Sequence, residues 1–502
     1  MTDAVGTEPG VTSRRSFLVV AGAGGVALLA AGCGSGKTGS SPTVTSDGAF
    51  VQPVVHKSSD GRLELTLRAE AQKVPFGNGT RFAYTYNGST PGPTLRVRPG
   101  DRLVVTLENE LDTDTNLHTH GLHVSPSGDA DNIFVTVSPG QSHTYTYDIP
   151  ADHRSGLFWY HPHTHGHVAE QVAAGLAGAI VVTDGIDEIS EMASSIERVW
   201  VLADPPIGSD AAALVGVSGM SQMQGRQGDR VFVNGISQPD VAAAAGGLER
   251  WRLVNASASR YYRLVLDGHQ LHAIASDGGR LAAPVAVDEL MLAPGERTEL
   301  LVTPTKPGTY RLQALAYDRG TAGMGGGMGN GMGGRTGSST AELTIATMTV
   351  TGNSGPAALP SQLVEPGSMS PTPATSTRTL ELAMGMGNGS MMGGGGSMMG
   401  FTIDGKTFDP ARTDITVSLG AVEEWTIRNT SPMDHPFHLH VWPFQVIDGR
   451  APGGWKDTVN VPANSELRIR IPFTGIVGRT VYHCHILDHE DLGMMGVIDV
   501  AG

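Results

Sequence analysis

A strand motif that occurs three times along the chain limits the folds available to it. Each copy starts at a glycine, runs through eight residues that are typical of a turn followed by a strand, and ends at an asparagine. The copies occupy residues 100–109, 246–255 and 420–429. This internal repeat predicts three tandem copies of one β-domain.

The composition agrees with an all-β chain. Glycine accounts for 68 of the 502 residues and charged residues for 17%, which suits strands joined by many turns better than helical bundles. Because turn signals separate the predicted strands at regular intervals, each copy fits a Greek-key β-sandwich. We expect residues 1–33 to be an export signal, 34–50 a flexible tether, 51–187 the first domain, 188–351 the second, 352–377 a linker and 378–502 the third.

A further repeated element indicates which domains carry the functional site. In the first and third copies a histidine, His161 or His483, stands five residues after a glycine, whereas the matching residue of the middle copy is Gln313. We therefore expect the site between the first and third domains, with the middle domain as spacer and wall. Residues 277–279 of the middle domain, Asp-Gly-Gly, predict a hairpin turn.

Residues 483–495 contain the side chains of a redox metal site. On a strand, Cys484 points to the opposite face from the histidines on either side of it, so one cysteine lies between two metal environments. Cys484, His489 and Met494 supply a thiolate, an imidazole and a thioether. With one more histidine, these groups form a blue-copper electron-transfer site.

Three further histidine clusters precede this run. They are His118, His120 and His123; His161, His163 and His165; and His435, His438 and His440. A single His-X-His pair is weak evidence for a metal site, but four motifs in a fixed order are specific. From about residue 50 to its end the chain resembles the multicopper oxidases, most closely their bacterial three-domain laccase and cuprous-oxidase branch. The resemblance implies three cupredoxin-like domains.

The resemblance also implies four copper ions and their ligands. It assigns the type 1 copper to His435, Cys484 and His489, with Met494 as a weak axial ligand. It assigns the type 2 copper to His118 and His438. For the type 3 pair it assigns one ion to His120, His161 and His485 and the other to His163, His440 and His483.

The same resemblance gives Cys484 a catalytic role, as the conduit for electrons from the type 1 copper to the three-copper cluster. Reduction of dioxygen at the cluster needs protons, which carboxylates can deliver. Glu490 matches the acid of bacterial relatives, and Asp131 or Asp129 matches the acid that follows the first motif; the sequence leaves that choice open. Three nearby histidines are candidates for orienting the ligands, but solvated or structural roles are the favoured expectation for each of them: His123, His165 and His167.

The N-terminal segment has the pattern of an export signal. Arg14 and Arg15 precede an apolar, glycine-rich stretch, which matches a twin-arginine signal and is too short for a stable membrane span. Residues 31–33, Ala-Gly-Cys, resemble a lipoprotein processing site, although Ala30 stands where leucine is usual. We expect export to the cell envelope with a lipid anchor on Cys33, at the outer face of the cytoplasmic membrane. The alternative is ordinary cleavage that releases a soluble product.

The two cysteines bear on disulfide formation, and the net charge bears on the possible partners. The only cysteines are Cys33 and Cys484, and we expect no disulfide between a processing site and a metal ligand. A formal charge of −15 argues against nucleic acid as a partner. The expected partners are dioxygen and a small reductant, either cuprous ion or a phenolic or aromatic compound.

Methionines bear on the choice of reductant. Residues 323–334 and 384–399 combine methionines with too much glycine for a packed core. The resemblance implies loops that collect cuprous ions through thioethers; a low-complexity loop with no metal role is the alternative. Met433, two residues before His435, matches a substrate-copper methionine of cuprous-oxidase relatives, whereas Ser431 replaces their aspartate.

The leading hypothesis is a multicopper oxidase that couples one-electron oxidation of cuprous ion, phenols or aromatic amines to four-electron reduction of dioxygen to water, with a role in copper tolerance. A narrower oxidase of organic, bilirubin-like substrates is one alternative. A noncatalytic copper-sequestering or envelope scaffold protein is another, although a scaffold has no need of a complete ligand set.

Overall fold

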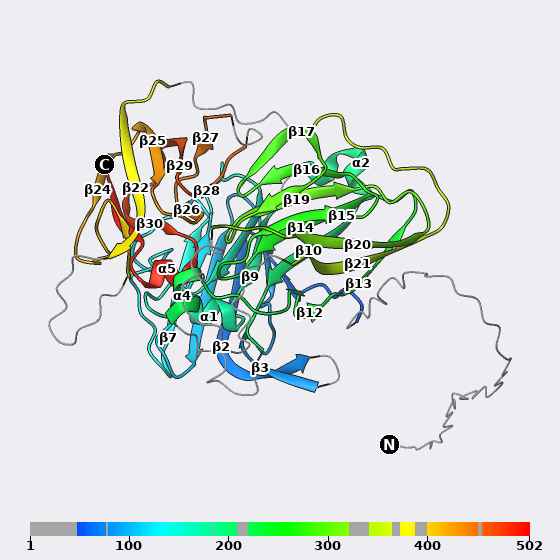
Figure 1. Ribbon diagram of the computed structural model, residues 1–502, viewed down its shortest axis with the longest axis horizontal. Helices are drawn as coiled ribbons and strands as arrows, with labels where there is room; N and C mark the ends of the chain where they lie inside the picture. Colours follow the sequence, from blue (N-terminus) through cyan, green and yellow to red (C-terminus); the bar gives the residue numbers. More distant parts are fainter. Residues whose placement is uncertain are drawn as a thin grey trace, which may run out of the picture. The chain divides into compact units, whose positions relative to one another are not determined.

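The computed structural model describes residues 48–76, 79–183, 185–207, 219–320, 341–363, 372–386, 399–449 and 454–502. All of them belong to one compact unit, Thr45–Gly502. The strands of these described residues form six sheets. In Figure 1 the sheets group along the chain into a blue to cyan, a green and a yellow to red region.

The strands before residue 183 form the first sandwich. They are β1 (Val55–Lys57), β2 (Arg62–Phe76), β3 (Gly79–Tyr86), β4 (Thr94–Val97), β5 (Arg102–Glu110), β6 (His118–His120), β7 (Ser142–Asp148), β8 (Gly156–His161) and β9 (Gly178–Val182). One sheet has the order β1-β4-β9-β8-β6 and the other β3-β2-β5-β7. Leu67 and Tyr147 from one sheet and Phe158 and Ile180 from the other belong to one buried cluster, so the sheets pack face to face.

The second sandwich is built in the same way from the next part of the chain. Its strands are β10 (Ile196–Ala203), β11 (Phe232–Val233), β12 (Ile236–Ser237), β13 (Asp240–Ala244), β14 (Glu249–Asn255), β15 (Tyr262–Leu266), β16 (Leu271–Ser276), β17 (Gly279–Val287), β18 (Leu290–Leu292), β19 (Arg297–Val302), β20 (Gly308–Leu315) and β21 (Leu343–Thr351). The sheet orders are β12-β11-β10-β14-β19-β16-β17 and β13-β21-β20-β15-β18. Trp251 and Leu300 meet Leu264 and Ile345 in its core.

The third sandwich contains the remaining strands. They are β22 (Ser376–Met386), β23 (Met399–Ile403), β24 (Ile415–Ser418), β25 (Val422–Asn429), β26 (His435–Leu439), β27 (Gln445–Val446), β28 (Thr458–Val461), β29 (Ser465–Pro472), β30 (Gly478–Cys484) and β31 (Met495–Ala501). The sheet orders are β23-β22-β25-β29-β27 and β24-β31-β30-β26-β28. Trp425 and Ile469 pack against Phe437 and Tyr482 between them.

Helices are short in the described residues. They are α1 (Val168–Ala174), the 3-10 helix η1 (Gly185–Glu188), α2 (Ser190–Ala193), α4 (Gly219–Gln224) and α5 (Leu487–Asp491). None of these helices is long and apolar enough to cross a membrane.

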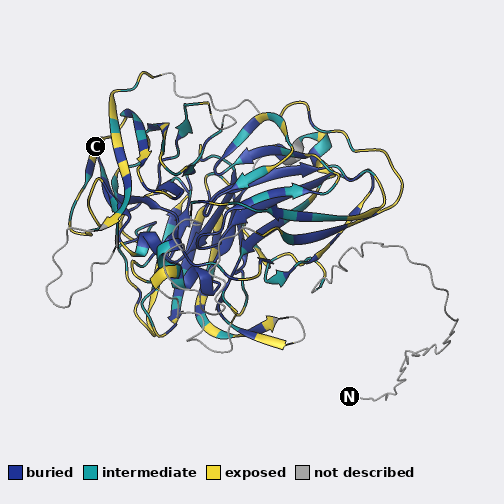
Figure 2. Ribbon diagram, in the orientation of Figure 1, coloured by how far each residue is buried: buried dark blue, intermediate teal, exposed yellow. Residues whose placement is uncertain are grey.

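Burial along each strand follows the number of its covered faces. β13 alternates exposed and buried residues, whereas β14, which lies between β10 and β19, is buried throughout. Burial of Arg250 and Arg252 in β14 is tolerated because both pair with Glu299, at 2.7 and 2.5 Å. Figure 2 shows the buried residues concentrated in the strands where the sheets pack.

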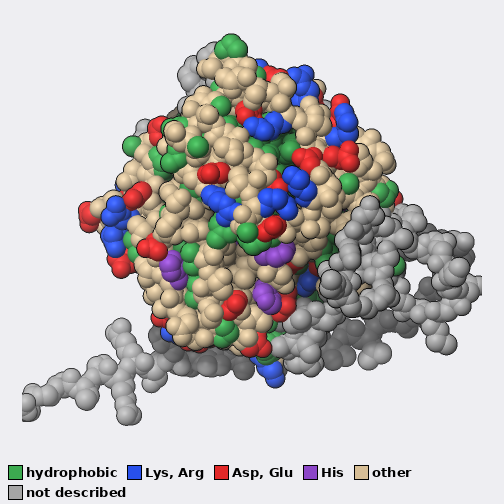
Figure 3. Space-filling model, turned by 90° about the vertical axis from the view of Figure 1, so that its left-hand side faces the viewer, with side chains coloured by type: hydrophobic (Ala, Val, Ile, Leu, Met, Phe, Trp, Pro, Cys, Tyr) green, Lys and Arg blue, Asp and Glu red, His purple; other side chains and the backbone are tan. Residues whose placement is uncertain are grey.

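Charged side chains of both signs cover the outside. On the face in Figure 3, acidic and basic side chains are intermingled rather than gathered by sign. Neighbouring strands of the third sandwich carry such pairs, for example Arg468 of β29 with Glu424 of β25 at 2.6 Å. These exposed pairs each contribute little to stability.

The expected all-β class is confirmed, and at least one residue each of the expected tether and the expected linker is packed against the rest of the protein. Phe50, placed in the tether, donates its N–H to the Asp240 carbonyl and packs on Trp200, with ring centroids 4.8 Å apart. Leu363, placed in the linker, is buried. The domain limits remain predictions, because the described chain forms one compact unit that is not divided at those positions.

Several expectations fall outside the described residues. They concern the signal of residues 1–33 with Cys33, the tether up to residue 47, and the methionine-rich segments 323–334 and 387–398. At the second methionine-rich segment the structure describes the two ends, since Met386 of β22 pairs with Met399 of β23.

One carboxylate joins the first and third sandwiches at a helix N-terminus. The first turn of α1 has no side-chain cap of its own. Asp491, at the end of α5, instead accepts hydrogen bonds from the N–H groups of Gly166, Val168 and Ala169, at 2.7, 3.3 and 2.9 Å. The acceptor satisfies amides that the helix itself cannot, and these hydrogen bonds favour the ionised form, although burial raises the pKa of Asp491 to about 7.

Replacing this carboxylate tests its contribution to the fold. We expect Asp491→Ala to lower stability by about 1–2 kcal/mol, as loss of an N-cap does, seen in calorimetry as a lower unfolding temperature. Asp491→Asn keeps an oxygen acceptor and should lose less. Equal stability of Asp491→Ala and the unchanged protein would show that these hydrogen bonds do not hold the two sandwiches together.

Candidate metal centre

Two strand pairs, one in the first sandwich and one in the third, face each other across the candidate site. β6 pairs with β8 so that His118 lies opposite His161, and β26 pairs with β30 so that His438 lies opposite His483. Imidazoles of the two sandwiches then stack, since the ring centroids of His120 and His438 are 3.8 Å apart. The histidines therefore gather between the first and third sandwiches.

Donor atoms of the predicted ligands fall into groups that suit single metal ions. In the described residues the buried groups whose ligand atoms lie within 4.8 Å of one another are His118, His438 and His440; His118, His120 and His161; His163, His440 and His483; His435, Cys484 and His489; and His120, His438 and Asp457. His485 is in none of these groups, but its ring centroid lies 5.0 Å from that of His120 and 5.8 Å from that of His161.

Four imidazoles bond through one ring nitrogen and leave the other without a partner. The bonded atoms are Nδ1 of His118, His161 and His438 and Nε2 of His120. The unpartnered atoms are Nε2 of the first three and Nδ1 of His120. A neutral ring that donates on one side keeps its lone pair on the other, which is how metal-bound histidines are held.

A second set of nitrogens converges on one point. Nε2 of His483 lies 3.2 Å from Nε2 of His163 and 3.1 Å from Nε2 of His440. The outer nitrogen of His483, Nδ1, lies 3.0 Å from the Cys484 carbonyl oxygen and bonds to it. Three inward lone pairs at this spacing fit a single bound ion.

Burial keeps these imidazoles neutral, as metal binding requires. Desolvation, followed by repulsion from neighbouring imidazoles, holds the pKa values of several rings well below the usual range: His118, His120, His163, His440, His483 and His485. Desolvation also lowers the pKa of His161 to about 3.

The cysteine forms a separate donor set with two histidines. Sγ of Cys484 lies 3.3 Å from Nδ1 of His435 and 3.8 Å from Nδ1 of His489, and the two nitrogens are 3.3 Å apart. Metal–ligand bonds of about 2.0–2.3 Å in a trigonal plane give similar edges. Burial raises the pKa of the Cys484 thiol, and a bound cation is what would favour the thiolate.

The second ring nitrogens of the two histidines in this donor set are hydrogen-bonded to the protein. Nε2 of His435 bonds to the Ser431 hydroxyl at 2.7 Å, and Nε2 of His489 bonds to the Met223 carbonyl of α4 at 3.0 Å. Phe401 stacks on His489 with ring centroids 4.0 Å apart. Both imidazoles are fully buried.

The candidate acids differ in their burial and in their contacts with the histidine cluster. Asp131 is buried, accepts a hydrogen bond from Nδ1 of His118 at 3.0 Å, and has its pKa raised by burial to about 7. The Asp129 side chain is 72% exposed and faces His143, so it does not contact the histidine cluster. Glu490 is fully buried, and burial raises its pKa. Its oxygens lie 3.1 Å from Nδ1 of His483 and 3.5 Å from Nε2 of His163.

Two residues that orient the ligands were missed by sequence reasoning. Asp457 Oδ1 and Thr458 Oγ1 each lie 3.1 Å from Nε2 of His120, and the Asp457 carbonyl accepts from Nδ1 of His438 at 2.8 Å. Burial alone would raise the pKa of Asp457, but the adjacent Arg297 holds it well below its usual range. Asp457 lies outside every histidine motif in the sequence, and only the fold brings it to His120, which lies 337 residues earlier in the chain.

The three histidines proposed to orient ligands have other contacts. Among the described residues none of them hydrogen-bonds to a predicted ligand. The His123 N–H donates to Nε2 of His153, and its Nδ1 lies 2.9 Å from the Val441 carbonyl. His165 packs against Phe408, and His167 is the N-cap residue of α1.

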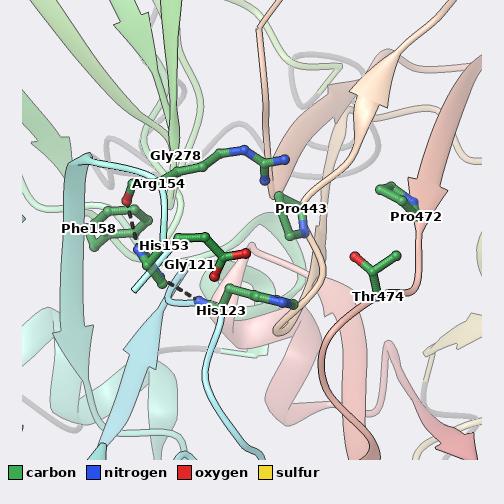
Figure 4. Close-up of a pocket in the computed structure, with 10 residues that line it drawn as sticks. Gly121, His123, His153, Arg154, Phe158, Gly278, Pro443, Pro472 and Thr474 are labelled. Carbon is green, nitrogen blue, oxygen red and sulfur yellow. Dashed lines mark hydrogen bonds between the residues drawn. The ribbon is translucent and has the colours of Figure 1, made fainter. Parts of the chain in front are cut away.

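A cavity of about 140 Å³ lies where all three sandwiches meet. Figure 4 shows His123, His153 and Arg154 on one side of it and Pro443, Pro472 and Thr474 on the other. The Arg154 guanidinium stacks over Trp455, 3.6 Å from the ring centroid. Gly121, which follows the predicted ligand His120 in the sequence, also lines the cavity, whereas His120 itself is fully buried.

Met494 and Met433 are both fully buried in the core of the third sandwich. The Cys484 N–H donates to the Met494 carbonyl, which places Met494 beside the cysteine. Burial of Met433 counts against direct contact with an incoming ion. Asp434 cannot replace the missing aspartate at Ser431, since its carboxylate accepts from Tyr317, Asn460 and the Ala463 N–H.

Comparisons with known proteins agree with this geometry. Family models described as multicopper oxidase match residues 68–186, 204–331 and 373–502. The chain is 31% identical to the multicopper oxidase mco of Staphylococcus haemolyticus, over 88% of this chain and 90% of that protein. The chain belongs to the multicopper oxidase family. It is also 32% identical to the cell division protein FtsP of Xenorhabdus nematophila, over 88% and 91% of the two chains.

A solved structure supports the fold of this multicopper oxidase. The multicopper oxidase from Campylobacter jejuni, described as a metallo-oxidase, superposes with a TM-score of 0.76 at 29% identity and covers 91% of this chain and 96% of its own. The expected cupredoxin-like sandwiches are therefore confirmed.

Four copper ions are the cofactors of this family, and the residues present fit them. The histidine cluster offers unpartnered, neutral ring nitrogens in a buried site. The set of Cys484, His435 and His489 offers the thiolate and imidazoles that select copper at a blue site. Bound copper would supply the one-electron redox chemistry at these sites.

Loss of the thiol tests the assignment of the cysteine. We expect Cys484→Ser to abolish the blue absorption and all oxidase activity, because a hydroxyl at this place cannot act as a thiolate ligand. The histidine cluster should still bind copper, measured as metal content after loading and dialysis. Full turnover by this variant would refute the assignment.

Proposed function

We propose that this multicopper oxidase withdraws electrons one at a time from a small reductant at a type 1 copper and uses them to reduce dioxygen to water at a three-copper cluster. The ligand roles implied by the resemblance are part of this proposal. His435, Cys484 and His489 would hold the type 1 copper with Met494 as a weak further ligand, and the remaining eight predicted histidine ligands would hold the cluster.

The observation that carries the proposal is the placement of Cys484 between the two donor sets. Its thiol belongs to one set, while its neighbour His483 belongs to the other and His485 lies beside it. Both sets are buried. A short covalent path therefore joins the two sites, and neither site is complete without this tripeptide.

Protons for the reduction of dioxygen are delivered by buried carboxylates in this proposal. Glu490 lies beside His483 and His163, and Asp131 lies behind His118. Both side chains are fully buried, and burial favours their protonated forms. Of the two aspartates considered, Asp131 rather than Asp129 reaches a predicted ligand.

Cuprous ion is the reductant that we favour. Nε2 of His489 is bonded to the Met223 carbonyl, one face of the ring is stacked on Phe401, and the imidazole is fully buried. A bulky phenol has no direct contact with this imidazole, whereas a small soft cation can be passed along thioethers. The description of the related Campylobacter jejuni protein as a metallo-oxidase agrees with this choice. A role in copper tolerance would follow.

Two other functions remain as alternatives. One is oxidation of phenols, aromatic amines or bilirubin-like pigments at the same type 1 site. The other is a noncatalytic envelope role, to which the similarity with the cell division protein FtsP lends support. The complete and buried donor sets favour an oxidase over a scaffold.

The proposed location is the cell envelope. The twin-arginine pattern and Cys33 support export and lipid anchoring at the outer face of the cytoplasmic membrane. Mass spectrometry of the protein isolated from its membrane fraction tests this, with a lipid on Cys33 as the expected result.

Copper content and oxygen uptake test the oxidase. Purified protein is loaded with copper, its copper-to-protein ratio and visible spectrum are recorded, and oxygen consumption is followed with cuprous ion and with a phenol. We expect a blue protein that consumes oxygen faster with cuprous ion. Full copper loading without oxygen uptake from either reductant would favour the scaffold.

Removing the acid beside the cluster tests proton delivery. We expect Glu490→Gln to slow reoxidation of the fully reduced enzyme by dioxygen by about 10²-fold, since an amide cannot donate a proton in the same way. Reduction by substrate should be unchanged. Asp129→Asn, which removes an exposed carboxylate, is the matched control. Stopped-flow reoxidation at the unaltered rate would remove Glu490 from the mechanism.

Thioethers are tested in two variants that spare the fold. The first replaces residues 387–398 with a short turn and keeps the paired strands β22 and β23. The second is Met433→Leu, which conserves volume in the core but lacks the sulfur. We expect slower cuprous oxidation with equal or faster phenol oxidation from the first variant.

For Met433→Leu we expect a selective loss of cuprous oxidation, because the resemblance assigns this thioether to substrate copper; unchanged cuprous oxidation would agree instead with the full burial of Met433. Steady-state oxygen uptake with each reductant separates the cases. If each variant loses cuprous and phenol oxidation in equal proportion, the methionines are structural. The protein would then be interpreted as a general laccase.

A further inference from the structure

Two side chains of the middle sandwich, which supplies none of the predicted ligands, contact the segment that lies behind the histidine cluster. Asp277 lies in the turn between β16 and β17, where the sequence predicts a hairpin, and Arg297 is the first residue of β19. Both side chains are 0% exposed. Ionised groups at such depth are costly unless they are paired, so their partners define what they do.

Both side chains hold the same short segment of the third sandwich. Arg297 forms a bidentate pair with Asp457, with Nη1 2.7 Å from Oδ1 and Nη2 2.5 Å from Oδ2. Oδ2 of Asp277 accepts the N–H groups of Asp457 at 3.3 Å and Thr458 at 3.4 Å. The side chain and the main chain of this segment are thus fixed by the middle sandwich.

The same segment supplies the acceptors for two predicted ligands from different sandwiches. Nε2 of His120 faces Asp457 Oδ1 and Thr458 Oγ1, both at 3.1 Å, and Nδ1 of His438 bonds to the Asp457 carbonyl at 2.8 Å. These contacts leave Nδ1 of His120 and Nε2 of His438 as the atoms without partners. The acceptor atoms of the Asp457–Thr458 segment therefore determine which nitrogen of each ring faces the cluster.

Glycines make room for this arrangement. A side chain at Gly279 would meet the backbone of Trp455, and one at Gly121 would meet the Arg297 guanidinium and the Asp457 carboxylate. Gly121 also has a φ of +89°, a conformation that other residues adopt rarely. The hairpin of the middle sandwich can therefore insert beside the cavity of Figure 4 and approach the ion pair.

We propose that Asp277 and Arg297 are positioning residues for the three-copper cluster, and that they act by fixing the Asp457–Thr458 segment that orients His120 and His438. The inference rests on the proposed roles of these two histidines as copper ligands. It gives the middle sandwich a part in metal binding beyond that of a spacer. Such outer contacts commonly change metal affinity by about 10–100-fold.

Selective loss of cluster copper is the expected result of breaking the ion pair. In Arg297→Gln, copper bound by the histidine cluster should be released at an about 10–100-fold lower chelator concentration than in the unchanged protein. The electron paramagnetic resonance signal of the type 2 copper should change or disappear. The blue absorption of the type 1 copper should stay, since Arg297 does not contact His435, Cys484 or His489. Copper content and both spectra are measured on the same copper-loaded protein.

Three further variants distinguish positioning from general stability. Arg250→Gln removes a guanidinium of similar burial, paired with Glu299 within the middle sandwich, and should keep all cluster copper. Asp277→Asn keeps the shape of the turn and should weaken cluster copper less than Arg297→Gln. Arg297→Lys keeps the charge without the bidentate geometry and should restore part of the copper affinity.

Each outcome decides between the inference and its alternatives. Parallel loss of type 1 and cluster copper in Arg297→Gln, or an equal loss in Arg250→Gln, would overturn the positioning role, because either result reports general destabilisation. Unchanged cluster copper in Arg297→Gln would overturn it as well. If the unchanged protein binds no copper at the cluster after loading, the proposed function itself fails, and the inference fails with it.

Discussion

The contact between the first and third sandwiches depends on imidazoles that are buried and neutral. A cationic ring at this depth would be costly, and desolvation keeps rings such as His161 unprotonated. Each neutral ring can donate once, and the donors point outward to acceptors such as Asp131 and the Asp457 carbonyl. The inward lone pairs are left unsatisfied by the protein. A bound cation would therefore stabilise this interface in addition to its role in the reaction, because metal binding and folding are coupled.

A single turn of helix near the C-terminus connects that interface to the rest of the protein. In α5, Asp488 pairs with Arg226 of the middle sandwich at 2.8 Å, and Asp491 caps α1 of the first sandwich. Between them lie His489, at the thiol site, and Glu490, at the histidine cluster. Four consecutive side chains point to four different neighbours because a helix advances about 100° per residue. A change of register here would disturb both metal sites and both interdomain contacts together.

Much of the site could be predicted because strand periodicity is visible in a sequence. Alternation along β30 separates Cys484 from His483, and the repeat shows that the middle domain has no matching histidine. Contacts that depend on how separate sandwiches meet were not predictable. Asp457 acts on His120, which lies 337 residues earlier in the chain, and no local pattern marks it. The burial of Met433 likewise depends on packing within the third sandwich.

The middle sandwich borders both metal sites although it carries no predicted ligand. At the thiol site, its helix α4 places the Met223 carbonyl on Nε2 of His489. At the cluster, Arg297 holds the aspartate behind His120. The first contact limits what can touch His489, a predicted type 1 ligand, and the second fixes which nitrogen of His120, a predicted cluster ligand, faces the cluster. The middle copy of the repeat, which carries no predicted ligand, therefore still bears on access to the thiol site and on how the histidine cluster is held.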